Sequence, residues 1–152
     1  MKNKITWSII HFDDLSVNQL FDILQLRNQI FIVEQDCPYL DIDDKDRKSF
    51  HVMGYNMQGQ LVATSRVLPP GVSYPEVSIG RVAVSVQARG TGIGHELNHK
   101  SVEFIFEYYG KVAIRLSAQK HLSKFYSKHS FKVVSDPYDE DGIPHVEMLF
   151  SP

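Results

Sequence analysis

The sequence has a single cysteine, Cys37, among its 152 residues, so no disulfide can form within the chain. A small domain without disulfides is typical of a reducing compartment, and we expect a cytoplasmic protein. The sequence also lacks an apolar run long enough to cross a bilayer, and its start, "MKNKITWSIIHFDD", lacks the apolar core of a secretory signal. These absences predict no membrane partner.

Blocks of basic residues are missing as well, and the formal net charge is −2. Proteins that bind nucleic acid usually carry a basic patch, so we expect no nucleic-acid partner. Hydrophobic residues make up 43% of the chain, which is enough for a proper core. The sequence therefore predicts one domain spanning residues 1–152.

Hydrophobic periodicity predicts strands that alternate with helices. A capping residue at Asp13, Asp14 or Ser16 favours a helix start there. The expected strands are 5–12, 50–56, 61–68, 77–85, 111–119, 131–135 and 144–150, and the expected helices are 15–34 (one or two), 91–109 and 121–129. Residues 35–49, 69–76 and 136–143 are expected loops. Hairpins mixed with crossover helices predict an α/β fold, with a sheet of mixed direction and helices on both faces.

Three glycines at alternate positions, Gly90, Gly92 and Gly94, separate the strand at 77–85 from the helix at 91–109. The first turn of a helix has unpaired N–H groups and a partial positive charge, and glycines let an anion approach the backbone closely. This arrangement predicts a phosphate or pyrophosphate site.

Two common phosphate sites do not fit this turn. A dinucleotide site needs G-x-G-x-x-G and an acid at the end of the next strand, but that strand ends in Ala118-Gln119. A P-loop needs Lys and then Ser or Thr after its last glycine, whereas His95 and Glu96 follow here.

The segment Arg89-Gly90-Thr91-Gly92-Ile93-Gly94 resembles the R-x-x-G-x-G motif of the GNAT superfamily of N-acetyltransferases. "FYSKHSF" resembles that family's F-Y-x-x-x-G-F segment, with Ser130 where glycine is usual. The stretches "LQLRNQIFIVEQDCPYLDID", "IGRVAVS" and "YDEDGIPHVEM" resemble its ElaA-like branch.

The resemblance implies a mixed, mainly antiparallel sheet whose central strands splay apart, with acetyl-coenzyme A in the cleft. It implies pantetheine binding by one strand and pyrophosphate binding by the glycine turn, and it allows a homodimer. The implied coenzyme-binding residues are Val82, Ala83, Val84, Arg89, Gly90, Thr91, Gly92, Ile93, Gly94 and Gln119. The other substrate would be an amine acceptor, and no metal is expected.

The resemblance places Tyr126 as the general acid, since a phenol is protonated at neutral pH and can donate to the departing thiolate. Ser78 falls at the position where many relatives have a glutamate base, and serine cannot serve. His145, Glu34 and Glu76 are the candidate bases, and His145 has the better intrinsic pKa. A water relay without a dedicated base is a further alternative.

A second reading of the glycine segment is a zinc site, because His95-Glu96-Leu97-Asn98-His99 fits H-E-x-x-H. The third ligand would be His121 or His129. Against the zinc site, the motif begins in the first helical turn, where the backbone would bind the anion. The preferred interpretation is that His95 and His99 are surface histidines. A zinc hydrolase and a non-catalytic acyl-coenzyme A sensor remain the alternative functions.

Other charged residues allow two interpretations each. Arg66 and Arg81 lie in strands and would form internal ion pairs or bind a substrate carboxylate. Two acidic loops would be solvated or would attract a cationic amine; their acids are Asp36, Asp41, Asp43, Asp44 and Asp46 in one and Asp139, Glu140 and Asp141 in the other. Cys37 lacks a histidine nearby in the sequence and is expected to be inert.

Overall fold

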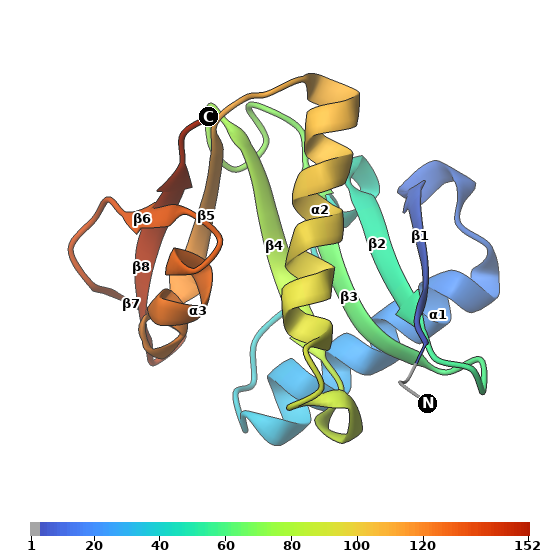
Figure 1. The fold of residues 1–152 in the computed structure, drawn as a ribbon. Coiled ribbons are helices and arrows are strands. Elements are labelled where there is room, and N and C mark those ends of the chain that lie inside the picture. Colours follow the sequence, from blue (N-terminus) through green and yellow to red (C-terminus); the bar gives the residue numbers. More distant parts are fainter. Residues whose placement is uncertain (1–3) are drawn as a thin grey trace.

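The computed structural model describes residues 4–152, which form an eight-stranded sheet with helices on both faces (Figure 1). The strand order is β1-β2-β3-β4-β5-β8-β6, and β7 pairs with β8 beside this path. The strands are β1 (Thr6–His11), β2 (Phe50–Tyr55), β3 (Leu61–Leu68), β4 (Val77–Val84), β5 (Ile114–Gln119), β6 (Phe131–Val133), β7 (Tyr138–Glu140) and β8 (Ile143–Phe150).

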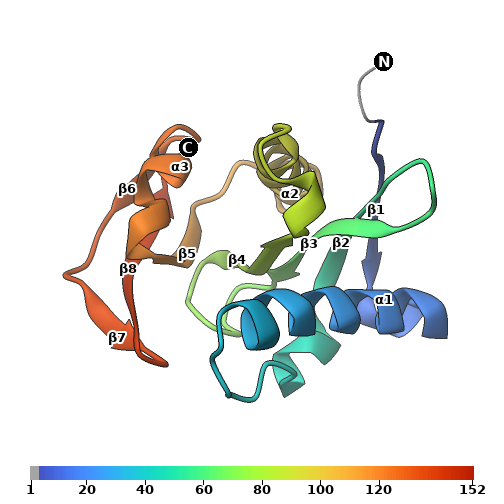
Figure 2. The same cartoon turned by 90° about the horizontal axis from the view of Figure 1, so that it is seen from below.

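The helices lie in two layers. In Figure 2, α2 (Ile93–Tyr109) and α3 (Ser123–Ser127) lie on one face of the sheet and α1 (Val17–Arg27) on the other. Ser16 begins α1 with a capping box, in which its hydroxyl accepts from the N–H of Gln19. The helix continues as a π-helix over Asn28–Glu34, a wider winding that is frequent at functional sites.

The sheet opens in its centre. Within residues 4–152 the parallel pairing is confined to β4 and β5, which meet only at Val77–Ile114 and Ser78–Arg115. Beyond these two pairs the strands diverge, as Figure 1 shows. The expected mixed sheet with splayed central strands is therefore confirmed.

A β-bulge bends β4 where it borders the opening. The register with β3 runs from Thr64 opposite Ala83 to Arg66 opposite Gly80, so β4 has one extra residue between them. Arg81 takes φ 47°, a left-handed conformation that residues other than glycine rarely adopt. Such strain persists only where surrounding contacts hold it.

The segment 136–143, expected to be a loop, forms β7 and a tight turn into β8. Asp141 and Gly142 both have positive φ, 54° and 82°, as a two-residue hairpin turn requires. The acidic segment before β2 also contains a turn of 3₁₀ helix, Asp44–Lys48. Both expectations of irregular loops were wrong at these places.

The core lies between the sheet and α2. Its fully buried members come from β2, β3, β5, α2 and β8, among them Val52, Ala63, Leu97, Ile105 and Met148. Over residues 4–152, no helix combines the length and apolarity that a membrane crossing requires.

Candidate active site

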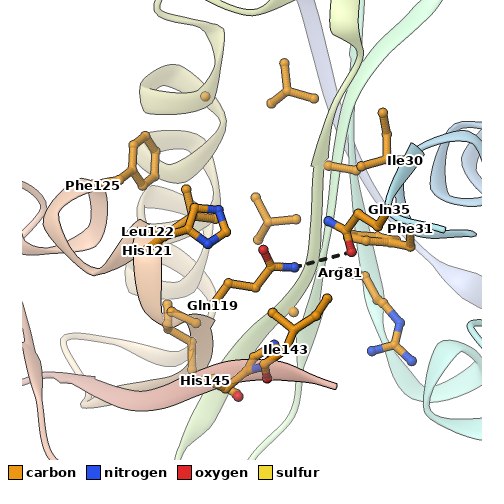
Figure 3. A pocket seen from close by; sticks show the side chains of 18 of the residues that line it. Ile30, Phe31, Gln35, Arg81, Gln119, His121, Leu122, Phe125, Ile143 and His145 are labelled. Carbon is orange, nitrogen blue, oxygen red and sulfur yellow. Dashed lines mark hydrogen bonds between the residues drawn. The ribbon is translucent and has the colours of Figure 1, made fainter. Parts of the chain in front are cut away.

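A cavity of about 1040 Å³ occupies the opening between β4 and β5. Its walls include Ile79–Val84 of β4 and Leu116–Gln119 of β5. Figure 3 shows Leu122 and Phe125 on one side of it, Ile30 and Phe31 of the π-helix on the other, and His145 beside β8. A volume of this size suits a large ligand.

The edge of β4 that faces this cavity is free to bind an extended chain. From Ile79 to Val84 the opposite edge pairs with β3, while among the described residues no strand pairs with the cavity edge. Alternate main-chain N–H and C=O groups therefore face the cavity, as in sites that bind a ligand by strand addition. Val82, Ala83 and Val84 lie on this stretch, where the resemblance places the pantetheine.

The glycine turn lies at one end of the cavity, immediately before α2. Gly90 and Gly92 have φ of 78° and 83°, so both positions favour glycine over any other residue. Gly92 is the N-cap residue of α2, and no side chain caps this helix. The first amides of the helix are thus available for an anion, and a Cβ at Gly90 or Gly92 would meet no atom within 4 Å.

Arg89 is paired with Glu34, and both residues line the cavity. Its guanidinium forms two hydrogen bonds with that carboxylate, one of 2.6 Å, and its Nε donates to the carbonyl of Val84 at 3.3 Å. Hydrogen bonding from Arg89 holds the pKa of Glu34 below its usual range. This pairing argues against Glu34 as a base at neutral pH.

The other acidic candidate is also engaged. Glu76 forms two hydrogen bonds of 3.0 Å with Arg115, and these hold its pKa below the usual range. Ser78 is buried in the part of β4 that pairs with β5. Neither residue lines the cavity.

Tyr126 lines the cavity from α3 and is only 5% exposed. Its ring packs edge to face against Phe125 and Phe131. Burial raises the pKa of Tyr126 to about 12, so the hydroxyl stays protonated at neutral pH. The residue can therefore donate a proton within the cavity.

His145 lies in β8 and also lines the cavity, at 8% exposure. Its Nδ1 lies 2.7 Å from the carbonyl oxygen of Ile143. A carbonyl only accepts, so Nδ1 carries the proton in the neutral ring and Nε2 keeps its lone pair. The residue lies on β8 between β5 and β7, and its Nε2 is 3.6 Å from Glu140 Oε2.

Gln119 ends β5 and reaches across the opening. Its Nε2 donates to Oε1 of Gln35 at 3.4 Å, the contact drawn in Figure 3. This bond links the β5 side of the cavity to the segment that follows the π-helix. Gln35 was not predicted as a site residue, because its hydrogen-bond partner, Gln119, is 84 residues away in the sequence.

A cluster of three arginines and three aspartates supports the bulge in β4. Arg81 Nε lies 2.8 Å from Asp41 Oδ1, and its Nη2 donates to the Asp41 carbonyl at 3.0 Å. Arg27 is 1% exposed and binds two of the aspartates. We call this group, Arg27, Arg66, Arg81, Asp41, Asp43 and Asp46, the arginine–aspartate cluster.

The cluster decides between the interpretations of the first acidic loop. Asp41 and Asp46 are buried, and the partly exposed Asp43 bonds to Arg66, so all three carboxylates are paired within the protein and are not free to attract a substrate. Arg66 and Arg81 form the internal ion pairs that were one of two expectations. Arg27 was missed, since a buried arginine within a helical segment gives no signal in the sequence.

The histidines of the H-E-x-x-H match do not converge. His95 Nδ1 lies 2.9 Å from His129 Nε2, while His99 is exposed and lies 4.0 Å from Glu103. In residues 4–152 no three His, Cys, Asp or Glu side chains are grouped so that they could hold a metal ion. Cys37 lines the cavity, and its Sγ donates to the carbonyl of Asp141 at 3.4 Å.

A splayed parallel pair, a glycine turn before a helix and a cavity between them define the acyl-coenzyme A N-acyltransferase class of fold. Residues 25–151 match the family model described as an acetyltransferase (GNAT) domain, and the chain belongs to this family.

Relatives and solved structures agree with this assignment. The chain is 41% identical to Protein ElaA of Escherichia coli, over 95% of both chains, and 40% identical to a UPF0039 protein of Synechocystis, over 97% of this chain and 96% of that one. The crystal structure of Escherichia coli ElaA superposes with a TM-score of 0.91 at 39% identity, covering 97% of this chain and all of the other. An acyl-CoA N-acyltransferase from Pseudomonas aeruginosa gives 0.92 at 37% identity, with the same coverage.

Proposed function

We propose that this protein transfers an acetyl group from acetyl-coenzyme A directly to a primary amine. The observation that carries the proposal is the cavity between β4 and β5, which joins a free strand edge to a glycine turn at a helix N-terminus. A strand edge fits the amide groups of pantetheine, and the helix N-terminus fits a pyrophosphate. A cytoplasmic location accords with this substrate.

Within this proposal, the coenzyme is held by the residues that border the opening. The main chain of Val82–Val84 pairs with pantetheine, and the amides of Arg89–Gly94 bind the pyrophosphate. Gln119 would contact the same substrate once its bond to Gln35 is exchanged. The hydrogen bond from Arg89 Nε to the Val84 carbonyl would likewise break when pantetheine binds that carbonyl.

The chemistry needs a proton acceptor, a proton donor and a polarised carbonyl. The bound thioester supplies an activated acetyl group. His145 Nε2 accepts the proton that the amine loses as the new N–C bond forms. Main-chain N–H groups of β4 polarise the thioester carbonyl, and Tyr126 donates a proton to the sulfur as the C–S bond breaks.

The surroundings of His145 and Tyr126 support these roles over the alternatives. In its neutral form His145 has a lone pair on Nε2, because Nδ1 donates to Ile143, whereas Glu34 and Glu76 are each bound by an arginine. Tyr126 is protonated at neutral pH, as a donor must be. The scattered histidines of the H-E-x-x-H match favour a transferase over a zinc hydrolase.

Calorimetric titration with acetyl-coenzyme A, followed by a thiol-release assay with a panel of amines, tests the proposal. We expect saturable binding at one site per chain and amine-dependent release of coenzyme A. An absence of binding up to millimolar ligand would overturn the proposal. Binding without turnover of any amine would favour the non-catalytic sensor.

A further inference from the structure

We infer that the acceptor is a diamine, which has a protonated amino group besides the amine that reacts. Glu140 and Asp141 on the β7–β8 hairpin bind this ammonium group. This inference rests on the proposed acetyl transfer and names the class of its acceptor. It follows from the charges that line the cavity, the position of the hairpin and the Nε2 of His145, which forms no hydrogen bond among the described residues.

The charged side chains around the cavity do not balance. Glu34 and Arg89 neutralise each other, and Arg81 is neutralised by Asp41 and Asp43 behind the wall. The two remaining carboxylates are Glu140 and Asp141, for which the described residues provide no lysine or arginine partner within salt-bridge distance. The lining therefore has an excess of negative charge at the hairpin.

The same inventory argues against an acceptor with a carboxylate, such as a free amino acid. Both arginines of the lining, Arg81 and Arg89, already bind carboxylates of the protein. A substrate carboxylate would have to displace one of these, and near the hairpin it would meet like charges. A cation meets neither obstacle.

The main chain of the hairpin that carries these two acids is tied at its turn. Asp139 Oδ2 accepts the N–H of Gly142 at 3.1 Å, which closes the turn. The Asp141 carbonyl accepts from Cys37 Sγ, so the turn also rests against the segment after the π-helix. Both acids thus border the cavity from a tied turn.

His145 provides a second sign of a ligand at this place, besides the charge of the hairpin. It is 8% exposed, its Nδ1 is satisfied by Ile143, and its Nε2 has no hydrogen-bond partner among the described residues. Glu140 Oε2 lies 3.6 Å from that nitrogen. A diamine can present its neutral amine to Nε2 while its ammonium group meets the carboxylates.

Three amines of equal chain length test the inference: 1,4-diaminobutane, butylamine and 4-aminobutanoate. With acetyl-coenzyme A at saturation and low ionic strength, we expect kcat/KM for the diamine to exceed that for butylamine about tenfold, from about threefold per exposed carboxylate. The carboxylate-bearing amine should be the poorest. Added salt should reduce the preference.

Variants then locate the charge. In Glu140→Gln/Asp141→Asn the diamine and butylamine should differ by about twofold or less, and Asp141→Asn alone should remove part of the preference. The ratio of the two amines is the readout, because any effect of Glu140 on His145 alters both substrates alike. Asp136→Asn, an exposed acid outside the cavity lining, is the matched control and should keep the full ratio.

The possible outcomes distinguish failure of the diamine inference from failure of the proposed acetyl transfer. Equal turnover of diamine and butylamine, or a preference that survives in the double variant, overturns the cationic acceptor and leaves acetyl transfer intact. Binding of acetyl-coenzyme A without acetylation of any amine overturns both.

Discussion

Replacing Asp46 with Asn should lower the free energy of unfolding by about 3–5 kcal/mol, because it removes one charge from a buried, balanced group. Asp46 is 3% exposed and accepts from Arg27 at 2.7 Å and from Arg66 at 2.9 Å. Asparagine keeps the shape of the side chain but leaves the cluster with an unmatched positive charge.

The size of the effect follows from burial rather than from the number of bonds. An exposed ion pair contributes about 0–1 kcal/mol, whereas loss of one partner from a buried pair leaves an uncompensated charge in a poorly solvated place. The free energy of unfolding of such domains is about 5–15 kcal/mol, so the variant should remain folded but with a much smaller free energy of unfolding.

Urea denaturation followed by circular dichroism measures the change. With a slope of about 2 kcal/mol per molar urea, the midpoint of Asp46→Asn should fall by about 2 M. Asp44→Asn is the matched control, two residues away with a fully exposed side chain, and its midpoint should match that of the wild type. Equal midpoints for both variants would refute the buried-charge reasoning.

The pH dependence gives a further check on the same group. Burial raises the pKa of Asp46, but hydrogen bonds and charges from Arg27 and Arg66 outweigh it, so the net pKa lies below the ordinary 3.8. A depressed pKa stabilises the fold above the unfolded value, and the stabilisation disappears as the pH falls below about 3.8. The gap between wild type and Asp46→Asn should therefore narrow in acid.

Four further predictions test the site and its support. Tyr126→Phe should lower kcat by about 10²-fold or more with little change in the binding of acetyl-coenzyme A, as steady-state kinetics and calorimetry will show; equal kcat would remove the phenol from the mechanism. His145→Gln should lower kcat by about 10²-fold with little change in the binding of acetyl-coenzyme A, and an unchanged kcat would point to a water relay. Gly92→Ala should destabilise the protein by about 1 kcal/mol, because the φ of Gly92 is 83°. Gly94→Ala is the control and should not destabilise it, because the φ of Gly94 is not positive. Equal thermal midpoints for the two variants would contradict the prediction. Ser130→Gly should stabilise it by about 0.5–1 kcal/mol, since Ser130 has φ 69°, and a lower thermal midpoint would argue against strain there.

Local sequence patterns predicted the parts of the fold that depend on neighbouring residues. The glycine turn, a helix cap among Asp13, Asp14 and Ser16, and most strands follow from short stretches, and the structure has them where they were expected, with Ser16 as the cap. Ser130, noted where the family usually has glycine, has the left-handed backbone that glycine prefers. The turn at Asp141-Gly142 also carried a local signal, the Asp-Gly pair of a hairpin, which was overlooked.

The remaining features depend on residues distant in the chain. Arg27 and Asp46 are 19 positions apart, and Gln35 and Gln119 are 84 apart, so neither contact leaves a pattern in any short stretch. Burial of Asp41 and Asp46 contradicts the usual behaviour of acidic loops, because three arginines on different elements meet them. The bulge at Arg81 was equally hidden, since arginine is not a residue that predicts positive φ.

Amide hydrogen exchange with and without acetyl-coenzyme A tests the central claim most directly. We expect slower exchange on binding in two segments, 79–84 along the free edge of β4 and 89–94 in the glycine turn, with no comparable change in β1 or β2. Protection that is absent from both segments, although calorimetry detects binding, would contradict the placement of the coenzyme between β4 and β5.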